Sequence, residues 1–152
     1  MTLLTIVHVL ISLVGIGAGL IVIAGFVTGN RFPRWNLLFL SATTATSLTG
    51  FLFPITKLTP GLVVGIVSLG VLGLAFAARG KNWSKTYVLT AATAEFLNVL
   101  VLITQLFEKV PSLHRYAPTG TEPVVAVVQG LALVFFGVLA VSAVRRSVYT
   151  VG

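Results

Sequence analysis

Three polar side chains stand inside an apolar stretch of the sequence that is long enough to cross a bilayer. The stretch runs from Ala91 to Lys109 (AATAEFLNVLVLITQLFEK) and contains Glu95, Asn98 and Gln105. In a helix, Asn98 and Gln105 lie on one face because they are seven residues apart, and Glu95 lies at the edge of that face. A charged side chain at the centre of a membrane helix costs about 2.5–3.5 kcal/mol. We therefore expect this polar face to point into protein or into a water-filled cavity.

Glu95 is the residue of the three that we expect to carry chemistry. A carboxyl group within a membrane span is a functional hypothesis by default, because it can work as a proton relay or as a cation site. For Asn98 and Gln105 the simpler interpretation is interhelical hydrogen bonding. Such bonds contribute about 0.6 kcal/mol each and at most about 1.7 kcal/mol.

Further polar residues are expected in the outer half of the membrane, on the topology given below. His8, Gln105 and Gln129 lie there, whereas Glu95 and Asn98 lie deeper. This pattern predicts a polar cavity open to the outside, with Glu95 towards its floor. The loop over residues 109–122 is expected to cover the cavity or, more simply, to connect two spans. It supplies three further candidates, His114, Arg115 and Glu122.

Other chemistries find few residues in this chain. It has no cysteine, so disulfides and thiolate metal sites are excluded, and no metal-ligand spacing is present. Motifs for hydrolysis or phosphate binding are absent, and a membrane-embedded enzyme is the least favoured interpretation. His8 is interpreted first as a packing histidine. A haem with two histidine ligands is disfavoured because His114 lies in a loop, a single-ligand haem is left open, and the sequence identifies no cofactor.

Five apolar segments have the length that a bilayer requires, about 20 residues each. The sequence thus predicts an all-α membrane bundle that forms one domain over residues 1–152. We expect the first segment to be a retained helix and not a signal peptide, because it lacks a basic start and a small-residue cleavage site. The predicted spans cover residues 3–27, 35–53, 60–78, 87–107 and 123–144.

Basic residues in the connections predict the orientation. With the N-terminus outside, seven of the ten Lys and Arg residues fall on the cytoplasmic side and three fall outside. The positive-inside rule favours this arrangement, which places the C-terminus in the cytoplasm. The outer three are Lys57, Lys109 and Arg115, and the inner seven are Arg31, Arg34, Arg79, Lys81, Lys85, Arg145 and Arg146.

Composition agrees with a membrane protein. Hydrophobic residues make up 57% of the chain and charged residues 9%, against about 25% charged residues in soluble domains. The net charge of +7 is interpreted as contact with anionic lipid headgroups, and nucleic acid is not expected as a partner. Glycine-bearing faces, such as that of Gly15 and Gly19, favour close helix packing and a homo-oligomer or a larger membrane complex.

Three segments of the chain resemble an uncharacterised group of small bacterial multi-pass membrane proteins. They are TSLTGFLFP (46–54), FLNVLVLITQLFEKVPSLH (96–114) and APTGTEP (117–123). The resemblance implies a location in the bacterial inner membrane. It implies no activity, cofactor or site residue.

Three functional hypotheses follow from these observations, of which a membrane-embedded enzyme is the least favoured. The first is a small binding or translocating module for a small lipophilic molecule, an ion or a proton, with Glu95 as its ionisable group. The alternative is an accessory subunit of a membrane complex, such as a respiratory one, that contacts quinone or haem held mainly by its partners.

Overall fold

A computed structural model of the chain describes residues 2–55, 58–80 and 84–149. The described residues form an all-α bundle, as the sequence predicts. Its helices are α1 (Leu3–Thr28), α2 (Pro33–Gly50), α3 (Pro60–Gly80), α4 (Ser84–Lys109), the short α5 (Pro111–His114) and α6 (Pro123–Tyr149).

Local sequence signals mark the helix ends. Four helices begin at a proline, whose fixed φ angle and missing N–H group suit the first helical position: Pro33, Pro60, Pro111 and Pro123. The start of α1 is capped instead by Thr2, whose hydroxyl accepts a hydrogen bond from the backbone N–H of Thr5 at 3.2 Å. The same helix ends at Gly29, where φ is +79°, a conformation that glycine adopts without strain.

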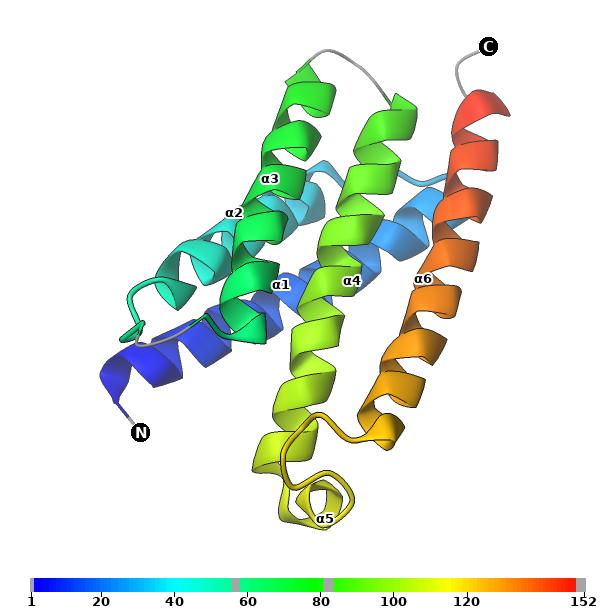
Figure 1. The fold of residues 1–152 in the computed structure, drawn as a ribbon. Coiled ribbons are helices and arrows are strands. Elements are labelled where there is room, and N and C mark those ends of the chain that lie inside the picture. Colours follow the sequence, from blue (N-terminus) through cyan, green and yellow to red (C-terminus); the bar gives the residue numbers. More distant parts are fainter. Residues whose placement is uncertain (1, 56–57, 81–83, 150–152) are drawn as a thin grey trace.

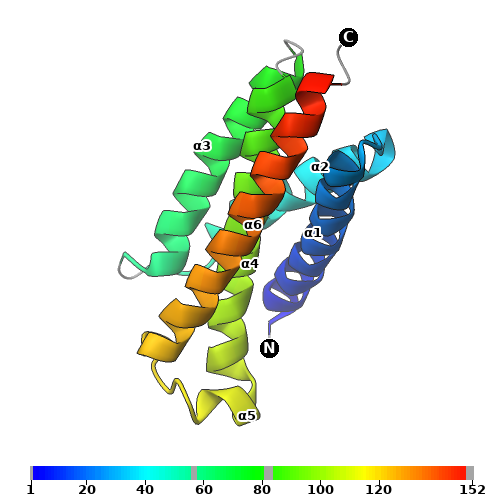
Figure 2. The same ribbon diagram turned by 90° about the vertical axis from the view of Figure 1, so that its right-hand side faces the viewer.

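The long helices form two groups that cross each other. In Figure 1, α3, α4 and α6 stand side by side with α4 in the middle, and the hairpin of α1 and α2 crosses behind them. The view at right angles shows the same hairpin on one side of α4 (Figure 2). In both views the start of α1 and the short α5 lie at one end of the bundle, and the ends of α3 and α6 lie at the other.

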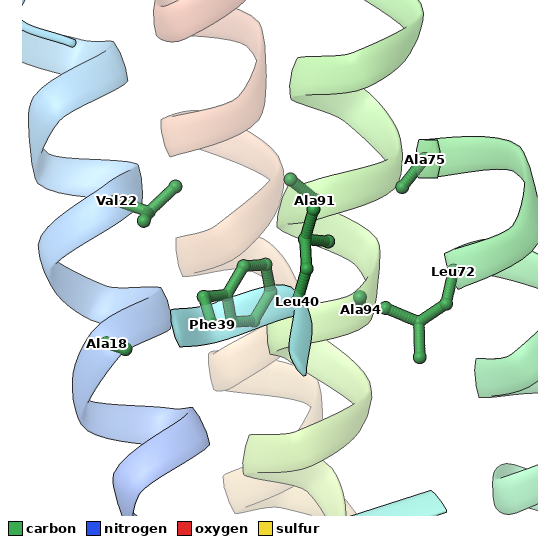
Figure 3. Packing of buried hydrophobic residues seen from close by; sticks show 8 residues of the cluster. All are labelled: Ala18, Val22, Phe39, Leu40, Leu72, Ala75, Ala91 and Ala94. Carbon is green, nitrogen blue, oxygen red and sulfur yellow. The ribbon is translucent and has the colours of Figure 1, made fainter. Parts of the chain in front are cut away.

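The main core forms where the hairpin meets α3 and α4. Figure 3 shows how α1 and α2 direct Val22, Phe39 and Leu40 towards the small side chains of α4. Alanine at these α4 positions lets the helices approach closely, which drives packing in a membrane. The cluster comprises Ala18, Val22, Phe39, Leu40, Leu72, Ala75, Ala91 and Ala94.

Four of the described helices are long and apolar enough to cross a membrane, namely α1, α3, α4 and α6. The prediction of a multi-pass membrane protein is therefore confirmed. The helix α2, which covers most of the predicted span at 35–53, is not among the four, because six of its 18 residues are Ser or Thr and lower its mean hydropathy. The fifth span and the orientation stay predictions. Lys57 and Lys81, which were counted in predicting the orientation, lie outside the described residues.

Candidate functional site

Glu95 is fully buried midway along α4. It lies 11 residues after Ser84 and 14 residues before Lys109, or about 16 Å and 21 Å along the helix axis. The helix continues without a break on both sides of Glu95, so the carboxyl group is held far from either end of the span.

The two carboxyl oxygens of Glu95 have different surroundings. Oε2 receives a long hydrogen bond of 3.5 Å from Nδ2 of Asn98, one turn further along α4. Oε1 is enclosed by protein and has no hydrogen-bond partner among the described residues. Burying a polar atom without a partner costs free energy, and burying a charge costs much more. The site therefore stabilises the negative charge of a carboxylate poorly.

Two residues of the α1–α2 hairpin complete the surroundings of the carboxyl group. A Cβ atom on Gly19 of α1 would overlap the carboxyl group of Glu95, so the absence of a side chain there makes room for it. From α2, the buried Thr43 accepts a hydrogen bond of 3.1 Å from Nδ2 of Asn98. We call Gly19, Thr43, Glu95 and Asn98 the carboxyl site, because three helices meet at these residues.

The two glutamines predicted to line a cavity lie away from the carboxyl site. Gln129 of α6 donates a hydrogen bond from Nε2 to the hydroxyl of Thr104 at 3.0 Å. Thr104 is nine residues from Glu95, which is two and a half turns, so it lies on the opposite face of α4. Gln105 is exposed, and its nearest polar partner is Glu108 on the same helix, at 3.5 Å. The structure thus brings Asn98 to Glu95 and leaves both glutamines apart from it.

His8 lies within the hairpin, towards the end of the bundle where α1 begins. Its Nδ1 atom is 2.8 Å from the hydroxyl oxygen of Thr49, and its ring packs edge-on against Phe53. The Thr49 hydroxyl already donates to the carbonyl oxygen of Ala45 at 2.8 Å. A hydroxyl has one proton to donate, so Nδ1 of His8 must be the donor in the first contact, and Nε2 is left as an acceptor.

The three loop candidates make contacts within their own segment. Arg115 lies over the ring of Tyr116, at 4.7 Å from its centre, and His114 is exposed. The carboxylate of Glu122 accepts hydrogen bonds from the backbone N–H groups of Thr119 and Thr121, at 3.0 and 3.1 Å. The Thr119 bond, followed by the other bonds to these two residues, lowers the pKa of Glu122. The loop is also fixed by Ala117, which is buried against α4 and α6.

Sequence reasoning missed the two hairpin residues of the carboxyl site. Gly19 was recognised as a packing residue, but nothing in the spacing connected it or Thr43 to Glu95. A second polar contact was also missed, in which the hydroxyl of Tyr87 donates to Oδ1 of Asn36 at 2.6 Å. It joins α4 to α2 nearer the other end of the bundle.

Among the described residues, no three His, Asp or Glu side chains lie close enough together to hold a metal ion. Comparison with models of known protein families, with curated proteins and with solved structures found no match for this chain. The multi-pass character rests on the four spans, and the bacterial group suggested by the resemblance stays a prediction.

Proposed function

We propose that this chain is a five-span protein of the bacterial inner membrane that binds and translocates protons at Glu95. One observation carries the proposal. The carboxyl group of Glu95 is completely buried at mid-span, and its Oε1 atom has no partner among the described residues. Intramembrane ionisable groups in such positions mark ion and proton pathways.

A proton suits the carboxyl site better than a metal cation or a lipophilic molecule does. Hard cations such as Ca²⁺ require six to eight oxygen ligands in total. The carboxyl group and the ring of Phe39 both lie close to Gly19, which has no side chain to offer as a ligand, whereas a proton needs only the carboxyl itself. A lipophilic ligand needs an open apolar space, and both the carboxyl group and the ring of Phe39 are fully buried.

Antiparallel pairing of α1 and α2 supports a crossing by α2. His8 contacts Thr49 near one end of the hairpin, and a Cβ atom on Gly15 would meet Thr43 at 3.4 Å nearer the middle. The chain therefore returns along α1 to the end where it began. With α2 as a span, seven of the ten basic residues lie in the cytoplasmic segments and the N-terminus lies outside.

Proton flux into liposomes tests the proposed function. The purified protein is reconstituted with a trapped pH-sensitive dye, and a pH gradient is imposed while the membrane potential is clamped. We expect Glu95→Gln to reduce flux to the level of protein-free liposomes, because the amide keeps the shape but cannot bind the proton. Glu108→Gln is the matched control, since Glu108 is exposed near the end of the same helix. Equal flux from Glu95→Gln and the unaltered protein, or no flux from the latter, would contradict the proposal.

The same preparation tests the alternative hypotheses. An accessory subunit of a respiratory complex is expected to carry partner chains, quinone or haem when it is extracted from its native membrane in mild detergent. A homo-oligomer is expected to show a single multiple of the chain mass. The absorption spectrum and the native mass, recorded together, distinguish these outcomes.

A further inference from the structure

Three threonines of α2 lie in series between His8 and the carboxyl site. Thr43, Thr46 and Thr49 follow each other at intervals of three residues, which is a rise of about 4.5 Å per step. At one end of this series, Thr49 binds Nδ1 of His8 at 2.8 Å. At the other end, Thr43 binds Asn98 at 3.1 Å, and Asn98 contacts Glu95. The series therefore has a titratable group at each end.

Thr46, the middle residue, has an unusual hydroxyl. A threonine within a helix ordinarily donates its hydroxyl to a backbone carbonyl one turn earlier, as Thr44 and Thr49 do on the same helix. The Oγ1 atom of Thr46 is buried and has no partner among the described residues. Among the described residues, Oε1 of Glu95 is the other buried side-chain oxygen without a hydrogen-bond partner. The middle hydroxyl of the series and the carboxyl group of Glu95 therefore each have an oxygen that can still form a hydrogen bond.

His8 lies on α1 beside Thr49, at the end of the series that is farther from Glu95. His8 precedes Gly19 by eleven residues, or close to three full turns, so both lie on the same face of α1. That face contacts the carboxyl group at Gly19 and the hydroxyl of Thr49 at His8. The buried residues of α1 all lie between Gly15 and Gly25, so the part of the helix around His8 is more open. Nε2 of His8 remains available to accept a proton.

We infer that protons reach Glu95 from the end of the bundle where α1 begins, along His8, Thr49, Thr46 and Thr43. This inference rests on the proposed function and names the route to its site. Nε2 of His8 accepts a proton from water, and Nδ1 releases one to the oxygen of Thr49. Each hydroxyl then accepts one proton and passes one on, so that the net change is one proton gained by Glu95. A step of about 4.5 Å exceeds a hydroxyl hydrogen bond, so the route requires a water molecule between neighbouring hydroxyls. It also requires one between Thr43 and the carboxylate of Glu95, because the amide of Asn98 donates to both groups and cannot pass a proton on.

Valine at position 46 tests the route, because it has the shape of threonine and lacks the hydroxyl. In the liposome assay we expect Thr46→Val to lower proton flux about tenfold or more, since one proton-passing hydrogen bond is lost. The variant is expected to be at least as resistant to unfolding as the unaltered protein, because a methyl group replaces a buried hydroxyl without a partner. A structural role alone would lower stability and flux together.

Two companion variants complete the test. Thr44→Val removes a hydroxyl of the same helix that is bonded to the carbonyl of Leu40, and we expect it to retain flux. Thr46→Ser restores a hydroxyl at position 46 and should restore flux. Full flux from Thr46→Val, together with loss of flux in Glu95→Gln, overturns the route and leaves the proposed function standing. Equal losses in Thr44→Val and Thr46→Val also overturn it. Full flux from Glu95→Gln overturns the proposed function itself.

Discussion

The carboxyl group of Glu95 occupies space that a glycine on another helix leaves free. Gly19 allows α1 to approach α4 so closely that the carboxyl group rests against the α1 backbone. The ring of Phe39, also fully buried, limits the same space from α2. Because interiors are close-packed, the position of this one carboxyl group is coupled to the spacing of three helices.

Substitution at Gly19 measures this coupling. A Cβ atom there would overlap the carboxyl group and lie 2.9 Å from Cδ2 of Phe39, and both of these side chains are fully buried. We expect Gly19→Ala to lower the free energy of unfolding by about 1–3 kcal/mol, as overpacked cores do. Gly17→Ala is the matched control, because nothing lies within 4 Å of a Cβ atom at that position. It is expected to be neutral or to stabilise the helix by up to about 1 kcal/mol.

Thermal unfolding of the two variants in mild detergent makes the comparison. A midpoint for Gly19→Ala equal to that of Gly17→Ala would show that α1 does not pack against Glu95 as described. A lower midpoint for Gly19→Ala alone supports the contact.

Single-helix spacing predicted part of the carboxyl site. Asn98 was expected beside Glu95, and it lies there, because residues three positions apart are neighbours on any α-helix. The contributions of Gly19 and Thr43 depend on how helices cross, which spacing within one helix does not encode. Gln129 shows the same limit, because it contacts α4 at Thr104, on the face opposite Glu95. Both glutamines were identified from the sequence. Their positions could not be predicted, because spacing within one helix does not show which faces of α4 and α6 pack together.

At the scale of whole elements, α2 differs most from a typical membrane helix. Six of its 18 residues are Ser or Thr, yet three of its polar side chains, Asn36, Thr43 and Ser47, are buried. They are covered because α2 lies between α1 and α3 and meets α4 through Asn98 and Tyr87. A polar helix is stable here because its polar groups face protein.

Several helix ends lie close to the ends of the apolar segments in the sequence. The helices α1, α3 and α6 start at Leu3, Pro60 and Pro123, where those segments start, and α1 ends one residue after the first segment. The end of α6 extends five residues beyond the predicted span, because helical structure continues past the apolar stretch that a bilayer requires. The four-residue α5 was not predicted, since one helical turn leaves no periodic pattern in the sequence.

The connection between α5 and α6 should respond to acid through Glu122. Hydrogen bonds from Thr119 and Thr121 lower the pKa of Glu122 in the folded loop. The carboxylate therefore stabilises the loop fully above the ordinary glutamate pKa, and this contribution is lost as the pH falls through the lowered folded-state value. We expect amide hydrogen exchange at Thr119 and Thr121, corrected for the intrinsic pH effect, to accelerate over that acidic range.

Glu122→Gln provides the control for this loop. The amide of glutamine can still accept a hydrogen bond, but it does not titrate. The variant is expected to show faster corrected exchange at neutral pH and no further change on acidification. Equal pH dependence in both proteins would indicate that another group controls the loop.

At the scale of the whole molecule, the number of crossings determines which connections share a side of the membrane. The chain has no cysteine, so one introduced cysteine gives a unique label at each exposed connection. Suitable positions are Asn30 between α1 and α2, Leu58 before α3, and Tyr116 in the loop before α6.

If α2 crosses, Leu58→Cys and Tyr116→Cys react with a membrane-impermeant maleimide on intact cells, and Asn30→Cys reacts only after the cells are opened. If α2 remains on one side while the other four long helices cross, all three positions lie on the same side. We expect the first result, because α2 runs antiparallel to α1 and returns the chain to the end where α1 begins. The second result would contradict the five-span proposal and would place Thr49 and Thr43 at similar depths, leaving the route from His8 without a direction across the membrane.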